Sequence, residues 1–172
     1  PTAAVIAGQY YGRRFGLPEM FCFDMGGTTA KSCLIQGGEA GVVQTFEVGR
    51  VQRFMKGSGL AIQVPVVDLM EIGAGGGSIA KVSRLGTLQV GPESSGAAPG
   101  PICYGKGDRI TVTDANLCLG RLVPGNFLGG EMPLYAEKAE QVIRDNVADP
   151  LGLELEEAAF TIWSTVNVGL VS

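Results

Sequence analysis

The chain of 172 residues contains no histidine. Histidine is the commonest general base and the commonest transition-metal ligand in proteins, so its absence excludes both roles here. Any chemistry must therefore use carboxylates, lysines, hydroxyl groups, thiols or a bound ion.

Cysteine is scarce, and its spacing does not fit a metal site. The four cysteines are Cys22, Cys33, Cys103 and Cys118, and none of them forms a CxxC pair. Three lie in apolar surroundings typical of small core residues, whereas Cys103 lies in a glycine- and proline-rich stretch, where a reactive thiol is the alternative. We therefore expect free thiols, a reducing environment and a cytoplasmic protein.

Charge and long apolar runs are also sparse. Charged residues make up 17% of the chain, the formal net charge is −4, and no basic stripe is visible. Surfaces that bind nucleic acid are rich in clustered lysine and arginine, so no nucleic-acid partner is expected. No apolar run approaches the roughly 20 residues that cross a bilayer, so no membrane association is expected either.

The chain is rich in glycine and in apolar residues, as compact, turn-rich folds are. It has 27 glycines and 45% hydrophobic residues, which argues against disorder. Strand patterns come first and helical patterns later, so we expect an α/β or α+β fold with one domain over residues 1–172. The chain begins at Pro1 and stops just after a helical pattern, and we interpret it as a fragment of a longer polypeptide.

Hydrophobic periodicity and chain breakers predict the individual elements. Helices are expected at residues 2–15, 114–121, 134–147 and 154–169, strands at 20–24, 31–36, 42–48 and 60–72, and a hairpin at 79–91. The strand at 60–72 is expected to break at Pro65. Residues 91–109 show no periodicity, and their apolar and aromatic residues favour a packed functional loop over a linker. Thr113 and Asp114 are expected to cap the helix that begins at residue 114; an anion- or metal-linked site is the alternative.

The most informative stretch is the hairpin pattern of residues 21–35, in which an apolar run ends at Asp24 and a second strand follows two glycines and two hydroxyl residues. Its turn exposes backbone N–H groups that suit a phosphate, beside a carboxylate that suits a metal ion. Asp24 is the candidate metal ligand, and the candidate phosphate-binding residues are Asp24, Gly26, Gly27, Thr28 and Thr29. The alternative is an ordinary tight turn with a solvated aspartate. Lys31 either neutralises phosphate charge or points into solvent.

A second glycine-rich segment, the glycine loop (residues 73–78), follows an apparent strand. Bare backbone there permits close approach of a phosphate, so Gly75, Gly76 and Gly77 are further candidates for cofactor binding. The segment does not match the P-loop pattern. Structural close packing is the alternative explanation. No residue is assigned to catalysis.

Together these segments resemble the hydantoinase A/oxoprolinase family, which contains ATP-dependent N-methylhydantoinases, 5-oxoprolinases and related subunits of acetone and acetophenone carboxylases. The matching motifs are residues 23–31, 71–80, 90–105 and 111–122. The chain departs from many relatives at residues 29–31, where it reads Thr-Ala-Lys in place of Ser-Thr-Asp, and this fits the N-methylhydantoinase-like branch better.

The resemblance implies a ribonuclease H-like lobe of the actin/Hsp70/sugar-kinase superfamily, in which an ATP site lies between two lobes. Residues 24–29 would form one of two phosphate loops, and the lobe with the other loop lies outside this chain. ATP and Mg²⁺ are the implied cofactors. The implied partners are a small cyclic amide and a B-type hydantoinase subunit or domain, in an oligomeric assembly.

The implied reaction is the ATP-dependent opening of a cyclic amide such as hydantoin, N-methylhydantoin or 5-oxoproline, through phosphorylation of the amide oxygen. One alternative is a subunit of an ATP-dependent ketone carboxylase. Another is a non-catalytic, actin-like scaffold lobe. The 172-residue piece alone is expected to be inactive, because half of the cleft would be missing.

Overall fold

The structure, a computed structural model, describes residues 1–49, 51 and 57–171. The chain divides into two compact units, which are described separately. The first unit comprises residues 1–24 and 31–71, and the second comprises residues 25–30 and 72–172. The expected single lobe over residues 1–172 therefore stays a prediction.

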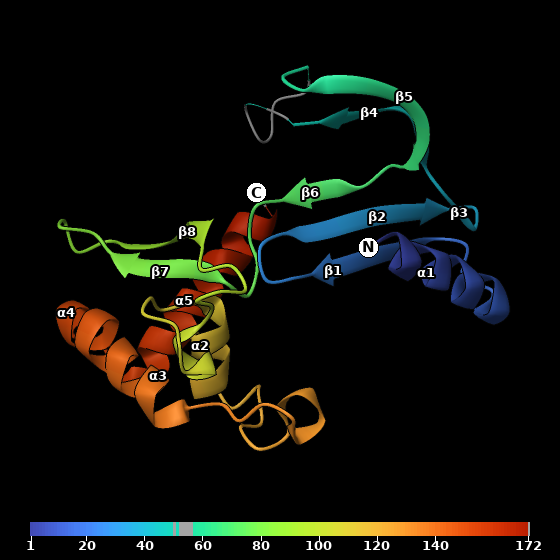
Figure 1. The fold of residues 1–172 in the computed structure, drawn as a ribbon. Coiled ribbons are helices and arrows are strands. Elements are labelled where there is room, and N and C mark those ends of the chain that lie inside the picture. The colour runs from blue at the N-terminus through green and yellow to red at the C-terminus, as the bar shows by residue number, and fades with distance from the viewer. Residues whose placement is uncertain (50, 52–56, 172) are drawn as a thin grey trace. The chain divides into compact units, whose positions relative to one another are not determined.

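The N-terminal half contains one helix and a strand-rich segment (Figure 1). Its elements are α1 (Thr2–Phe15), β1 (Met20–Met25), β2 (Ala30–Gln36), β3 (Glu39–Ala40), β4 (Val42–Val48), β5 (Leu60–Val67) and β6 (Met70–Ile72). One sheet has the order β1-β2-β3, with β6 also paired to β2, and β4 and β5 form a separate two-stranded sheet. These elements confirm the helix at 2–15 and the strands at 20–24, 31–36 and 42–48, whereas the stretch expected as one strand at 60–72 forms two, β5 and β6.

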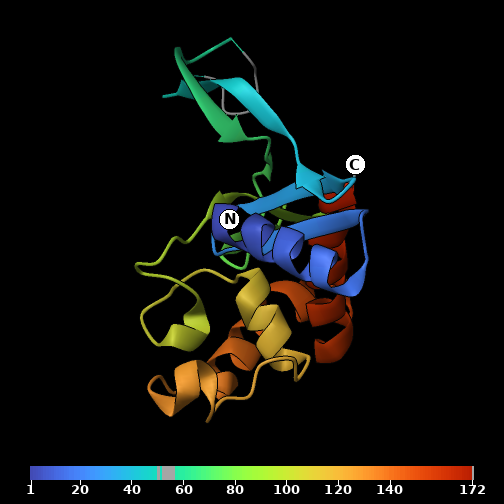
Figure 2. The same ribbon diagram turned by 90° about the vertical axis from the view of Figure 1, so that its right-hand side faces the viewer.

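The helix α1 ends where the sequence places its breakers. Gly16 adopts a left-handed conformation with φ of 68°, which glycine reaches without steric cost, and its N–H donates to the carbonyl of Gly12. Val5 of α1 is buried against Cys33 and Ile35 of β2. This small cluster attaches the helix to its sheet, and Figure 2 shows α1 lying along the strands.

The β4–β5 ribbon explains how a proline fits inside a strand. The antiparallel register runs from Val43 opposite Val66 to Thr45 opposite Gln63, so β5 carries one extra residue in this interval. Pro65 lies in this bulge, where the missing N–H costs no regular ladder bond. The expectation that the strand breaks at Pro65 is therefore wrong: β5 continues through it.

The C-terminal half begins with a hairpin and continues with helices (Figure 1). Its elements are β7 (Ser78–Val82), β8 (Leu88–Ser94), η1 (Ile102–Tyr104), α2 (Val112–Cys118), η2 (Phe127–Gly130), α3 (Ala136–Ile143), the π-helix η3 (Arg144–Ala148), α4 (Asp149–Leu151) and α5 (Leu155–Val171). The hairpin expected at residues 79–91 is confirmed. Among the described residues, no helix combines the length and the hydropathy that a bilayer span requires.

The start of α2 differs from the sequence prediction. The helix begins at Val112 with Thr111 as its N-cap, two residues before the expected cap at Thr113. Thr111 and Asp114 form a capping box, in which each side chain accepts a hydrogen bond from the backbone N–H of the other residue. The spacing of three residues between a hydroxyl and a carboxylate was therefore the decisive local signal.

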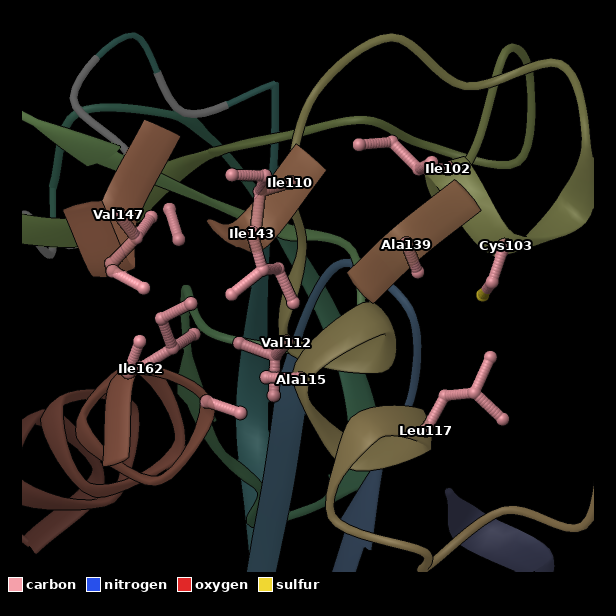
Figure 3. Packing of buried hydrophobic residues seen from close by; sticks show 14 of the residues in the cluster. Ile102, Cys103, Ile110, Val112, Ala115, Leu117, Ala139, Ile143, Val147 and Ile162 are labelled. Atoms are coloured by element: carbon pink, nitrogen blue, oxygen red, sulfur yellow. The ribbon is translucent and has the colours of Figure 1, made fainter. Parts of the chain in front are cut away.

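The main core lies between the helices and the β7–β8 hairpin of the second unit. Buried residues recur every four positions on α3 and the π-helix (Ala139, Ile143, Val147) and on α5 (Ala158, Ile162, Val166). This spacing places them on one face of each helix. Figure 3 shows Ile143, Val112 and Ile162 converging in this core.

We expect the substitution Ile162→Ala to lower the free energy of unfolding by about 2–5 kcal/mol, because it opens a cavity in a packed core. The matched control is Leu85→Ala in the β7–β8 turn, where the side chain is 93% exposed. The control should change stability by less than about 0.5 kcal/mol. Urea denaturation of the full-length protein measures both, and equal midpoints would contradict the core position of Ile162.

Candidate functional site

The turn between β1 and β2 offers free backbone donors. The N–H of Gly26 donates to the carbonyl of Thr29 at 2.9 Å and closes the turn. Gly26, Gly27 and Thr28 are exposed, and Thr29 is half-buried. Within the part of the chain that the structure describes, the N–H groups of Gly27 and Thr28 have no hydrogen-bond acceptor. These two adjacent donors suit an anion.

The glycine loop lies directly against this turn. The N–H of Gly76 donates to the carbonyl of Gly26 at 2.9 Å, and the N–H of Gly77 donates to the carbonyl of Gly27 at 2.7 Å. A Cβ on Gly75 would lie 2.6 Å from the oxygen of Gly26. A Cβ on Gly77 would lie 2.9 Å from the oxygen of Gly27. The two backbones can approach this closely only because no side chain separates them.

The glycine loop therefore supports the turn and does not supply further free donors. The N–H of Gly75 is also engaged, because it donates to the hydroxyl of Ser78 at 2.9 Å. Gly75 and Gly77 are buried. The structure brings Gly75, Gly76 and Gly77 together with the turn. This geometry favours close backbone packing, the alternative explanation for these three residues.

Two further segments hold the glycine loop. The carbonyl of Gly76 accepts hydrogen bonds from both the N–H and the hydroxyl of Thr113, each at 2.8 Å. The carbonyl of Gly77 accepts one from the N–H of Ser95 at 2.9 Å. The first turn of α2 and the residue after β8 thus fix the glycine loop, which in turn supports the 26–29 turn through hydrogen bonds.

Asp114 is a fully buried carboxylate that joins α2 to the long loop before it. It accepts hydrogen bonds from the N–H groups of Cys103 (2.8 Å) and Ile102 (3.3 Å), and from the N–H and hydroxyl of Thr111 (both 2.8 Å). Four donors compensate the desolvation of the charge. The loop is thus packed at Ile102 and Cys103, but its expected start at residue 91 is wrong, because β8 continues to Ser94. The local cap motif gave no sign of these contacts, because the partners lie 11 and 12 residues earlier.

Asp24 and Lys31 belong to the first unit. The side chain of Asp24 is 47% exposed, and one carboxylate oxygen lies 3.5 Å from the nitrogen of Pro1. Lys31 forms an ion pair with Glu71 at 3.4 Å, so its charge is already partly compensated. Among the described residues, no group of three or more acidic residues, cysteines or histidines gathers as a metal cage. An exposed single carboxylate fits Mg²⁺, which is usually held by one or two carboxylates together with phosphate oxygens and water.

The four cysteines are free thiols. Cys103 is fully buried, and its pKa is raised well above the usual value by burial and by the neighbouring Asp114 carboxylate. Burial, together with nearby carboxylates, also raises the pKa of Cys118 to about 12. The interpretation of Cys103 as a reactive thiol is therefore wrong, because nucleophilic attack needs an accessible thiolate.

Comparison with known proteins gives consistent matches. A family model described as Hydantoinase/oxoprolinase matches residues 1–171. Caprolactamase subunit alpha of Pseudomonas jessenii is 42% identical over 173 residues, which cover 100% of this chain and 24% of that protein. Acetophenone carboxylase gamma subunit of Aromatoleum aromaticum is 38% identical over 174 residues, which cover 100% of this chain and 23% of that protein.

Solved structures agree with the sequence matches. Nucleotide-free acetone carboxylase superimposes with a TM-score of 0.80 at 30% identity, over 97% of this chain and 22% of the other. The chain thus spans about a quarter of the length of the curated relatives it matches. The predicted fold class, an α/β lobe of the actin/Hsp70/sugar-kinase type with strands first and helices later, is confirmed.

We expect Gly75→Ala to destabilise the second unit by more than about 1 kcal/mol, because its Cβ would lie within 2.7 Å of backbone atoms of Gly26 and Gly27. The matched control is Gly125→Ala, where a Cβ would meet no atom within 4 Å. The control should be neutral or slightly stabilising. Thermal unfolding compares the two variants, and equal melting temperatures would contradict the close packing.

We expect Cys103 to resist alkylation by iodoacetamide in the native full-length protein between pH 7 and 9. A raised pKa keeps the thiol protonated throughout this range, and burial blocks access. Because burial raises the pKa of this thiol only in the folded state, the unfolded chain loses the proton first, and unfolding becomes easier as pH rises through the ordinary thiol range. Mass spectrometry of the peptide that contains Cys103 measures labelling, with urea-unfolded protein as the positive control; rapid native labelling would refute this expectation.

Proposed function

The chain belongs to the hydantoinase/oxoprolinase family, because the family model covers residues 1–171. From this premise we propose that it is part of the large subunit of an ATP-dependent enzyme that opens cyclic amides. The observation that carries the proposal is the exposed 26–29 turn, in which two adjacent N–H groups lack an acceptor within the described residues. Similarity to caprolactamase subunit alpha and to the solved structure of the ATP-dependent caprolactamase from Pseudomonas jessenii supports the choice of a cyclic amide.

The residues of the turn match the needs of a triphosphate. The N–H groups of Gly27 and Thr28 would donate to phosphate oxygens, and the hydroxyls of Thr28 and Thr29 would add donors. The carboxylate of Asp24 would hold Mg²⁺. When bound, ATP supplies the phosphoryl group that makes a stable amide carbonyl reactive.

The protein's own contribution is positioning and charge stabilisation. Phosphoryl transfer requires aligned groups and fixed donors more than acid–base chemistry, so a chain without histidine can support it. The glycine loop holds the turn through backbone bonds of 2.7 and 2.9 Å, which gives the donors a fixed geometry before a ligand arrives. Gly75, Gly76 and Gly77 would act on the cofactor indirectly, through this support.

A second candidate is a subunit of an ATP-dependent ketone carboxylase. The 38% identity to acetophenone carboxylase gamma subunit and the TM-score of 0.80 with acetone carboxylase favour it. The turn would serve both reactions equally, since both need a phosphoryl group on a carbonyl-type oxygen. A non-catalytic scaffold lobe remains the third alternative.

The relatives are named as alpha, beta and gamma subunits, and this supports an assembly with a partner. We therefore propose a B-type hydantoinase subunit or domain as the partner, in an oligomer to which residues 1–172 contribute one lobe. Cytoplasmic location stays a prediction.

The test of the proposed function is ATP hydrolysis by the full-length protein together with its partner. The substrate panel should contain caprolactam, hydantoin, N-methylhydantoin, 5-oxoproline, acetone and acetophenone. Ring opening coupled to ATP hydrolysis is the expected result. Incorporation of bicarbonate into a ketone would favour the carboxylase instead, and a lack of Mg²⁺-dependent ATP binding would leave only the scaffold.

We expect Asp24→Ala to reduce ATP turnover by at least about 100-fold, because a charge-stabilising metal ligand would be lost. Circular dichroism should show an intact fold, since the side chain is half exposed. The matched control is Asp68→Ala, another exposed carboxylate of the first unit that lies outside the proposed site. Near-normal turnover in Asp24→Ala would make this residue an ordinary turn aspartate.

A further inference from the structure

The contacts around Thr113 point to a role for this residue beyond the start of a helix. We propose that Thr113 is a positioning residue, which holds the 26–29 turn in place through the glycine loop. The expected effect of Thr113 on ATP binding rests on the proposed function, whereas its effect on the position of the 26–29 turn does not. No atom of Thr113 needs to touch the nucleotide for this role.

The first step is the double contact with Gly76. Both the N–H and the hydroxyl of Thr113 donate to the carbonyl oxygen of Gly76, each at 2.8 Å. A carbonyl oxygen has two lone pairs, so both donors can bind it at the same time. The two bonds fix the orientation of the Gly76–Gly77 peptide more tightly than a single bond would.

The second step leads from the glycine loop to the turn. The N–H groups of Gly76 and Gly77 donate to the carbonyls of Gly26 and Gly27 at 2.9 and 2.7 Å. Only backbone atoms take part, so no flexible side chain can absorb a displacement. A Cβ on Gly76 would lie 2.8 Å from the hydroxyl oxygen of Thr113, so a side chain at this position would displace the hydroxyl from the Gly76 carbonyl.

The third step is the rigidity of Thr113 itself. It is the second residue of α2, between the capping residue Thr111 and the fully buried Asp114. The four hydrogen bonds to the Asp114 carboxylate tie this end of the helix to Ile102 and Cys103 of the preceding loop. The hydroxyl that reaches Gly76 therefore extends from a fixed support.

The substitution Thr113→Val separates positioning from folding. Valine keeps the branched shape and the backbone N–H, so the Gly76 carbonyl retains one donor and no buried group is left unsatisfied. Thr113→Ser keeps the hydroxyl, so its hydrogen exchange at residues 73–78 and its KM for ATP should match those of the wild type. Thr161→Val is the matched control, because it removes a 2.7 Å hydroxyl–carbonyl bond inside α5, away from the glycine loop.

The test uses the full-length protein with its partner and two measurements. Hydrogen exchange followed by mass spectrometry reports on peptides that cover residues 73–78, and steady-state kinetics gives the KM for ATP and for the amide. Thr113→Val should speed exchange of the Gly76 and Gly77 amides about three- to tenfold and raise the KM for ATP by a similar factor. The KM for the amide should change less than twofold, and peptides of α3 and α5 should exchange as in the wild type.

The outcomes separate this inference from the proposed function. Unchanged exchange at residues 73–78 would overturn the positioning role, and so would equally faster exchange throughout α3 and α5. Faster local exchange with an unchanged KM for ATP would keep the positioning role and overturn the turn as an ATP site. Failure of Thr113→Ser to restore slow exchange would also overturn the role of the hydroxyl.

Discussion

The close approach of two backbones, at Gly26–Gly27 and at Gly75–Gly77, is the constraint on which the candidate site depends. The N–H groups of Gly76 and Gly77 donate hydrogen bonds of 2.9 and 2.7 Å to the carbonyls of Gly26 and Gly27, and side chains on Gly75 or Gly77 would prevent this contact. The carbonyls of Gly26 and Gly27 are thereby engaged, whereas the N–H groups of Gly27 and Thr28 have no acceptor among the described residues. One backbone contact thus both fixes the turn and leaves its donors for an anion.

A buried carboxylate gives this arrangement its support. Asp114 is fully buried and accepts four hydrogen bonds, which connect the start of α2 to the loop at Ile102 and Cys103. Hydrogen bonds to the charged form offset its desolvation, so the carboxylate acts as a structural centre. Burial, and after it the Asp114 carboxylate, raises the pKa of the Cys103 thiol and keeps it protonated.

The family and the geometry agree on the kind of chemistry that the chain can support. These 172 residues contain no histidine, and the exposed turn with its engaged glycine loop provides fixed N–H donors that can stabilise negative charge. The chain spans about a quarter of the length of the curated relatives it matches. The proposed role of these residues concerns the nucleotide, and the substrate assays decide between an amide and a ketone.

The sequence alone determined the features that depend on local spacing: the helix ending at Gly16, the β7–β8 hairpin, the four-residue periodicity of α3 and α5, and the turn of residues 26–29. The predicted cap of α2 is wrong, although the three-residue spacing of Thr111 and Asp114 is visible in the sequence. The predicted break at Pro65 is also wrong, because a bulge depends on the partner strand, which the local pattern does not name. Only the tertiary structure decided that Gly75–Gly77 support the turn, that Lys31 pairs with Glu71, and that Asp114 anchors a distant loop. The reason is physical: periodicity records which face of an element is apolar, whereas these contacts depend on distances between segments far apart in the chain.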